Sequence, residues 1–237
     1  VTGGATDNDI CIGSSVDLTS SSTPLPSSIL SEDFETGAAG WVFVDSATEG
    51  STIATQVFHI ETAPYSRSST TAGFVNFSIT GSKFVLSLPD IGGSGSDTRT
   101  FLESPFFSTV GYTGDGTLSF NHVYKYWASS SPPEQVKVQI TTDGGTTWDD
   151  LQAYTADQGT PTNNAQVATA GNVTIPAIYM NQPNVKVRFR YISNWGYFWA
   201  LDDVSVTGTP APYTYSWTSN PAGFNSADQI STDMCRT

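Results

Sequence analysis

Apolar and polar residues alternate with a period of two along most of this chain, which is the pattern of strands with one buried face. The alternation is strict over residues 135–140, and the Asp143-Gly144 pair that follows predicts a tight hairpin, because both residue types tolerate positive φ. In that strand we expect the apolar side chains to be buried and the polar ones to point outward: Val136, Val138 and Ile140 against Lys137 and Gln139. Further strands are predicted at residues 73–79, 117–124, 172–176 and 184–189.

Helix signals are nearly absent. No long segment places apolar residues at i, i+3, i+4 and i+7, and Gly, Pro and Ser/Thr clusters interrupt the chain at short intervals. Several strands joined by turn-rich links, without a strand–helix–strand rhythm, indicate an all-β protein. We therefore predict a β-sandwich of jelly-roll type.

The two ends of the chain differ from its middle. Residues 9–19 resemble one strand of an immunoglobulin- or PKD-like repeat, and residues 213–217 resemble the next, which carries the core Trp. Pro- and Ser-rich junctions separate both from the middle. We predict an incomplete immunoglobulin-like domain in two parts, 1–23 and 212–237, around a jelly-roll domain, 24–211. The alternative is that both ends add edge strands to the central sandwich.

The charge balance narrows the classes of partner. The chain has 237 residues with 22 acidic and 9 basic side chains, a net charge of −13. That charge argues against nucleic-acid binding, which needs a basic stripe, and it disfavours an anionic membrane surface. No apolar run is long enough to cross a bilayer, so we expect no membrane insertion.

The chain ends carry the cysteines. Cys11 and Cys235 lie at opposite ends of the chain, and in an oxidising compartment they could form a disulfide; two unrelated thiols are the alternative. The chain opens on Val1 without an initiator Met or a signal peptide, so we interpret it as a piece of a longer protein.

Carboxylates gather at the two ends of the central region. Asp33 and Glu35 stand in its first strand segment, and Asp202 and Asp203 in its last. The first and last strands of an antiparallel sandwich often lie side by side, which would bring Glu35 and Asp202 together. Few Lys or Arg are nearby, so these groups either bind a cation or repel each other. Calcium accepts such carboxylates with carbonyls and water. In a regular strand Asp202 and Asp203 point to opposite faces, so only one would be a direct ligand.

Aromatic residues are concentrated in two segments, and their number exceeds what one core needs. Exposed Trp and Tyr rings stack on sugars or anchor protein partners. The candidates for a ligand-binding surface are Trp127, Trp195, Tyr197 and Trp199. The alternative is that all of these rings are buried or packed under loops.

The sequence contains few features that indicate a catalytic site. His59 and His122 are the two histidines, and neither has a second ligand at zinc spacing. No Gly-x-Ser-x-Gly segment is present. Glu103 with Glu134 is a conceivable carboxylate pair, but nothing in the pattern positions them. We therefore expect no enzyme.

An ordered set of motifs resembles the cleaved-adhesin family, the MAM-like jelly rolls of Bacteroidetes-type surface adhesins, which include haemagglutinin and gingipain modules. The motifs are DFETGAAGW (33–41), TFLESPFF (100–107), TLSFNHVYKYW (117–127), VKVQITTDGGTTWDDL (136–151) and VRFRYISNWGYFWALDDVSV (187–206). The resemblance implies a structural calcium at Glu35 and Asp202, with Asp33 and Asp203 as weaker candidates. The loop after Trp41 carries only Asp45 and Glu49, fewer acidic residues than family members often have.

The resemblance implies a non-catalytic adhesion or binding module of a large secreted bacterial cell-surface protein. Its partners would be a host or extracellular-matrix protein or glycan, or neighbouring copies of the same chain. Two alternatives remain, a structural subunit of an extracellular filament and an accessory carbohydrate-binding module of a secreted hydrolase. Because one fold serves many functions, the ligand cannot be named from the sequence.

Overall fold

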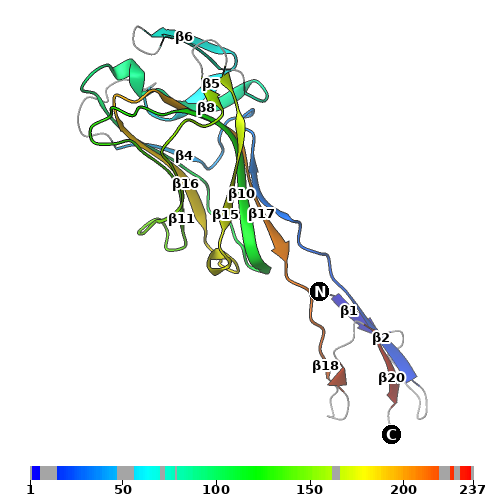
Figure 1. The fold of residues 1–237 in the computed structure, drawn as a ribbon. Helices are drawn as coiled ribbons and strands as arrows, with labels where there is room; N and C mark the ends of the chain where they lie inside the picture. Colours follow the sequence, from blue (N-terminus) through cyan, green and yellow to red (C-terminus); the bar gives the residue numbers. More distant parts are fainter. Residues whose placement is uncertain are drawn as a thin grey trace. The chain divides into compact units, whose positions relative to one another are not determined.

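Two antiparallel sheets form the larger part of the molecule (Figure 1). The computed structural model describes residues 2–5, 15–46, 56–69, 73–77, 79–161, 166–218, 225–226 and 230–235. The chain divides into two compact units: Ser27–Thr209, and Val1–Pro26 together with Pro210–Thr237. Each unit is described by itself. The assignment of the smaller unit as immunoglobulin-like stays a prediction.

The first sheet of the larger unit contains the longest strands. Its order is β15 (Thr169–Ile175), β10 (Tyr112–Lys125), β17 (Phe198–Pro210), β8 (Lys83–Ser87) and β5 (His59–Thr62), and β3 (Ser28–Glu32) also pairs with β17. The pairing of β3 with β17 is antiparallel, with Val204 opposite Glu32. The prediction that the first and last strands of the sandwich lie side by side is therefore confirmed.

The second sheet carries the predicted hairpin. Its order is β12 (Asp149–Tyr154), β11 (Gln135–Thr141), β16 (Lys186–Asn194), β9 (Asp97–Glu103) and β4 (Val42–Asp45). The turn between β11 and β12 places Gly144 and Gly145 at φ 80° and 92°, values that favour Gly. Val136, Val138 and Ile140 are buried, as expected. Gln139 lies on the outer face but is only 7 % exposed, because its neighbours cover it.

The remaining elements of the larger unit are short. They are the hairpins β6 (Tyr65–Ser69) with β7 (Gly73–Phe77) and β13 (Thr160–Pro161) with β14 (Gln166–Val167), and the 3-10 turns η1 (Pro89–Gly92) and η2 (Ala177–Tyr179). In the part of the chain that the structure describes, no helix is long and apolar enough to cross a membrane. The all-β sandwich that the alternation predicts is confirmed.

Apolar side chains fill two layers rather than one. The main core lies between the two sheets and includes Trp199, Phe189 and Val138. A second cluster lies on the other side of β8 and β17, where Phe77 of β7 contacts Phe84 and Phe198 with ring centroids 5.7 and 4.7 Å apart. β8 and the start of β17 are thus covered on both faces, which explains their nearly continuous apolar sequence.

The smaller unit is built from both chain ends. Its main sheet has the order β1 (Thr2–Ala5), β2 (Ser15–Ser21) and β20 (Ile230–Cys235), and β18 (Trp217–Thr218) pairs with β19 (Asn225–Ser226). Both edges of β2 are therefore occupied, by β1 and β20, and residues 213–217 do not pair with it. They contact the segment after β2 through two tyrosine hydroxyls: Tyr213 donates to the Thr23 carbonyl, and Tyr215 bonds to Ser22.

Candidate functional site

A change of strand partner positions the acidic residues. β17 pairs with β8 as far as Leu201, opposite Val85, and with β3 from Val204, opposite Glu32. Asp202 and Asp203 lie in the gap between the two ladders. Asp203 has φ 52°, an uncommon value for a non-glycine residue, so the strand is not regular here. We call Asp33, Glu35, Asp202 and Asp203 the carboxylate junction.

Asp202 is the buried member of the carboxylate junction, with a side chain 0 % exposed. Its Oδ1 accepts a hydrogen bond of 2.8 Å from the Asp203 N–H, whereas its Oδ2 is buried without a hydrogen-bond partner among the described residues. Burial raises the pKa of Asp202 to about 7, and repulsion from Asp203, Glu35 and Asp33 adds to the increase. A buried carboxylate with an unused oxygen is costly unless a cation or donor meets it.

Glu35 reaches across to the loop that precedes β8. Its Oε1 accepts the N–H groups of Ser82 at 2.6 Å and Lys83 at 2.8 Å, and its Oε2 accepts the Ser82 hydroxyl. The Ser82 hydroxyl, followed by these two N–H groups, lowers the pKa of Glu35. Gly81 permits this approach, since a Cβ there would stand 2.2 Å from Oε1. One lone pair of Oε2 stays open.

The other two carboxylates are already engaged by the protein. Asp33 Oδ1 accepts the Glu35 N–H at 3.1 Å, and Asp203 Oδ2 accepts the Asn121 amide at 2.8 Å. Over the described ranges, no group of three or more His, Cys, Asp or Glu side chains is arranged to hold a metal ion. The buried oxygen of Asp202 without a partner is nevertheless the kind of ligand that calcium accepts, together with carbonyls and water.

Three of the predicted ligand-binding residues form an aromatic cluster, which we define as Trp127, Trp195 and Tyr197. The Trp127 ring lies 5.7 Å from that of Trp195 and 5.0 Å from that of Tyr197, centroid to centroid, and Lys125 Nζ stands 4.5 Å from the Tyr197 ring. All three side chains are partly exposed. Each ring is therefore in part accessible to solvent, and Trp127 contacts both of the others.

The prediction for Trp199 is corrected by the structure. Its side chain is 0 % exposed and lies among core rings, including those of Phe58, Phe189 and Tyr191. Alternation along β17 suggested one solvent-facing side, but the second apolar cluster covers that side through Phe198. Trp199 is a core residue.

The carboxylates weighed for catalysis have structural partners. Glu134 is buried and accepts four hydrogen bonds, from the hydroxyls of Tyr124 (2.6 Å), Tyr191 (2.9 Å) and Ser193 (2.9 Å) and from the Trp127 N–H (2.8 Å). Glu103 lies on the outer face of the second sheet, with its oxygens 3.3 Å from Lys186 Nζ and 3.7 Å from Arg188 Nη1. Both carboxylates are thus engaged by groups of the protein.

The histidines are also accounted for. His122 is buried, its Nδ1 accepts the Trp199 indole N–H at 3.3 Å, and burial lowers its pKa to about 4. His59 Nδ1 lies 2.9 Å from the Val57 carbonyl oxygen. Cys11 lies outside the described residues and the side chain of Cys235 is likewise not described, so the disulfide stays a prediction.

Sequence reasoning missed the outer face of the second sheet. Lys186, Arg188 and Arg190 alternate with apolar residues in β16 and therefore share that face. The same alternation that identified the strand could have shown a row of cations in an acidic protein.

The two antiparallel sheets, packed face to face, place the larger unit in the class of β-sandwich domains. No family model matches the sequence, and no curated protein matches it. The K1 cleaved adhesin domain of Lys-gingipain from Porphyromonas gingivalis W83 is similar in structure, with TM-score 0.52 and 21 % identity over 76 % of this chain and 98 % of that domain.

Two further structures are similar over most of their length. The K3 cleaved adhesin domain of the same gingipain gives TM-score 0.46 and 23 % identity over 76 % of this chain and 97 % of that one. A Caldicellulosiruptor saccharolyticus CBM27-1 module in complex with mannohexaose gives 0.44 and 14 %, over 81 % and 100 %. The likeness to the K1 domain shows that the larger unit has the fold of a gingipain-type adhesin jelly-roll domain.

Proposed function

We propose that this chain is a non-catalytic binding module of a secreted bacterial cell-surface protein, and that it carries a structural calcium ion. Its ligand would be an extracellular-matrix protein or glycan. The jelly-roll fold shared with a cleaved adhesin domain is compatible with this proposal. The observation that carries it is the aromatic cluster.

The aromatic cluster is held in place by backbone bonds at each of its members. The Trp127 N–H donates to buried Glu134 at 2.8 Å, the Trp195 N–H donates to the Ser96 carbonyl at 3.0 Å, and the Tyr197 carbonyl accepts the Asp90 N–H at 3.4 Å. A ligand that stacks on these rings would thus order few protein groups on binding. Preorganised aromatic side chains of this kind dominate many interfaces.

The calcium ion would stabilise the fold and would not contact the ligand. Asp202 and Glu35 would hold it, with Asp33 and Asp203 close by, and the ion would offset the mutual repulsion of the four carboxylates. By joining the segment after β3 to β17, it would bridge the point where β17 changes partners. The chemistry that calcium supplies here is charge neutralisation.

The binding proposal is tested with the purified chain on immobilised human matrix proteins and a glycan array. For any ligand detected, the double variant Trp127→Ala/Tyr197→Ala should bind about tenfold more weakly or worse, the loss expected for aromatic hot spots. Phe106→Ala is the matched control, because Phe106 is an aromatic residue that is 54 % exposed and lies outside the cluster. Equal binding by the double variant and the wild type would refute the role of the cluster.

A further inference from the structure

The outer face of the second sheet gathers positive charge in an acidic protein. The side chains on this face alternate with core residues along β9, β11 and β16, and the strand registers place them in rows across the sheet. Of the nine Lys and Arg residues of the chain, five lie on this face: Arg99, Lys137, Lys186, Arg188 and Arg190. A local excess of cations on a chain of net charge −13 is a feature that needs a physical reason.

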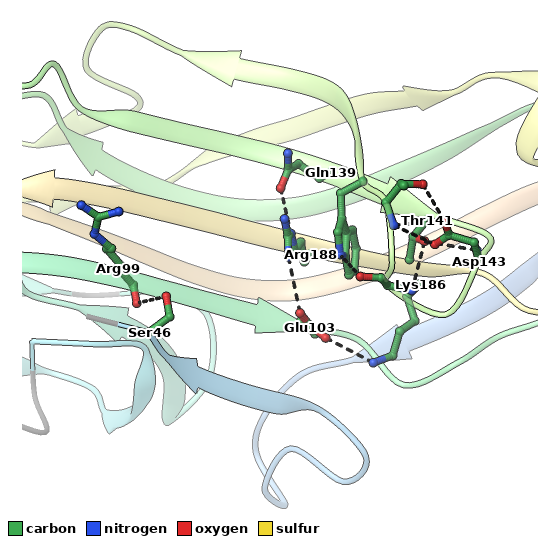
Figure 2. Close-up of polar contacts among 11 residues, drawn as sticks. Ser46, Arg99, Glu103, Gln139, Thr141, Asp143, Lys186 and Arg188 are labelled. Atoms are coloured by element: carbon green, nitrogen blue, oxygen red, sulfur yellow. Dashed lines mark hydrogen bonds and ion pairs between the residues drawn. The ribbon is translucent and has the colours of Figure 1, made fainter. Parts of the chain in front are cut away.

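A rigid turn brings an aromatic ring to this face. Between β11 and β12 the Asp143 carboxylate accepts a hydrogen bond of 2.7 Å from the Thr141 hydroxyl (Figure 2). It also accepts hydrogen bonds from the Thr147 N–H and hydroxyl, at 3.0 and 2.6 Å. The Thr147 hydroxyl is the largest contributor to the lowered pKa of Asp143. The indole N–H of Trp148 donates to the Gly145 carbonyl at 3.0 Å. The Trp148 ring is thereby fixed beside β16.

Arg188 has protein partners on both faces and at two nitrogens of its guanidinium group. Its guanidinium carbon lies 4.1 Å from the Trp148 ring centroid and 4.6 Å from that of Phe101, so it is stacked between two aromatic faces. Its Nε donates to the Gln139 amide oxygen at 2.8 Å, and its Nη1 lies 3.7 Å from Glu103 (Figure 2). Arg188 therefore has a structural role on this face of the sheet.

Arg190, two residues further along β16, has fewer protein partners than Arg188. Its Nη1 donates to the neutral amide of Gln135 at 2.8 Å, and no ion pair recorded between described residues includes it. The carboxylate of Asp150 attracts it, but both oxygens of that group are engaged, by Lys137 and Gln139. Partial burial lowers the pKa of Arg190, yet a guanidinium stays charged at physiological pH. The edge of its planar fork away from Gln135 is open to an anion.

An open groove of about 570 Å³ runs over this region, and we call it the outer groove. Its lining is polar apart from one aromatic ring, and it carries three cations against two carboxylates. The lining residues are Gln135, Lys137, Gln139, Thr146, Trp148, Asp149, Asp150, Arg188 and Arg190.

We propose that the outer groove binds an oligosaccharide that bears carboxylate groups, with Arg190 receiving one carboxylate and the other polar groups of the lining meeting sugar hydroxyls. Planar amides and guanidinium groups pair with hydroxyls and carboxylates. An acidic peptide is the less favoured partner, because the outer groove has no apolar pocket for a side-chain anchor of the kind that dominates peptide interfaces. The site is separate from the aromatic cluster.

The test compares matched probes on the intact chain by isothermal titration calorimetry. The probes are tetragalacturonate, its carboxyl-reduced counterpart, and hexaglutamate. We expect the wild type to bind tetragalacturonate about tenfold more tightly than the reduced tetramer, and the advantage to shrink as salt screens the charges. Arg190→Gln should remove that advantage, and Arg190→Lys, which keeps the charge but loses the fork, should retain part of it.

Lys186→Gln is the matched control, since it removes the same unit of charge from the same sheet face at a residue outside the outer groove. It should change the affinity by less than about threefold, the scale of a screened surface charge. Equal binding of the two tetramers by the wild type, or unchanged binding by Arg190→Gln, would overturn the site. Tighter binding of hexaglutamate than of tetragalacturonate would overturn the carbohydrate assignment. Trp127→Ala/Tyr197→Ala should leave tetragalacturonate binding intact, which separates this site from the proposed function.

Discussion

Replacing Asp202 by Asn should change stability in opposite directions with and without calcium. In EDTA at pH 8 the wild type holds a buried, ionised carboxylate beside three other acidic groups, whereas the amide that replaces it in the variant Asp202→Asn carries no charge. The variant should therefore be the more stable protein in EDTA. In calcium the stability advantage of the variant should shrink or change sign, because only the wild type retains the full set of calcium ligands.

The size of the effect in EDTA follows from the pKa of Asp202. Its folded-state value of about 7 lies above the ordinary 3.8, so the folded protein holds this proton more firmly than the unfolded chain. The corresponding stability is present below pH 4 and is lost as the pH rises through 7; at about 1.4 kcal/mol per pKa unit, the loss is about 4 kcal/mol. The new amide leaves a buried donor unpaired, at about 1–3 kcal/mol. The net gain should be about 1–3 kcal/mol.

The assay is urea unfolding of both proteins from pH 4 to pH 8, in EDTA and in calcium. The difference in the free energy of unfolding between the two proteins reports the contribution of Asp202. Neither curve alone does so, because the contribution of His122 to stability changes in the opposite direction over part of this pH range. Calcium at about a hundred times its dissociation constant should add about 2.7 kcal/mol to the wild type. A variant that is less stable in EDTA at pH 8, or equal stabilisation of both proteins by calcium, would refute the reasoning.

Two further predictions concern the buried polar groups. The folded-state pKa of His122 lies below the ordinary 6.5, at about 4, so its contribution of about 3 kcal/mol is present above pH 6.5 and is lost as the pH falls through 4; an imidazole resonance titrating near 6.5 in the folded protein would contradict this. Glu134→Gln turns an amide donor toward groups that themselves donate, and should lower the free energy of unfolding by about 2–4 kcal/mol in the same urea assay; an unchanged midpoint would show that the four hydrogen bonds are not needed.

Much of the sandwich could be predicted because alternation records which face of a strand is buried. Val136, Val138 and Ile140 lie in the core as the pattern indicates, and the Asp143-Gly144 pair marks the hairpin. The pairing of β3 with β17 was also predictable, since the first and last strands of an antiparallel sandwich often lie side by side.

The remaining features depend on tertiary context. Alternation along β17 places Phe198 and Trp199 on opposite faces, but it does not show that both faces are covered, Phe198 by the second apolar cluster and Trp199 by the main core. The positive φ of Asp203 arises where β17 changes partners, and no local signal marks that change. β20, the partner of β2, is mainly polar and short, so its pairing was not predicted.

The pairing of β3 with β17 places both ends of the larger unit at one end of the same ladder. The Gly208 N–H donates to the Ser27 carbonyl at 2.9 Å, and the pairing continues to Val204 opposite Glu32, where the carboxylate junction follows. A force that separates these two ends would break the hydrogen bonds between β3 and β17 one at a time until it reached the carboxylate junction. A calcium ion bound there would resist further separation of the two strands. In an optical trap the larger unit should open at low force in EDTA and resist further in calcium, and equal opening forces would show that the ion bears no load.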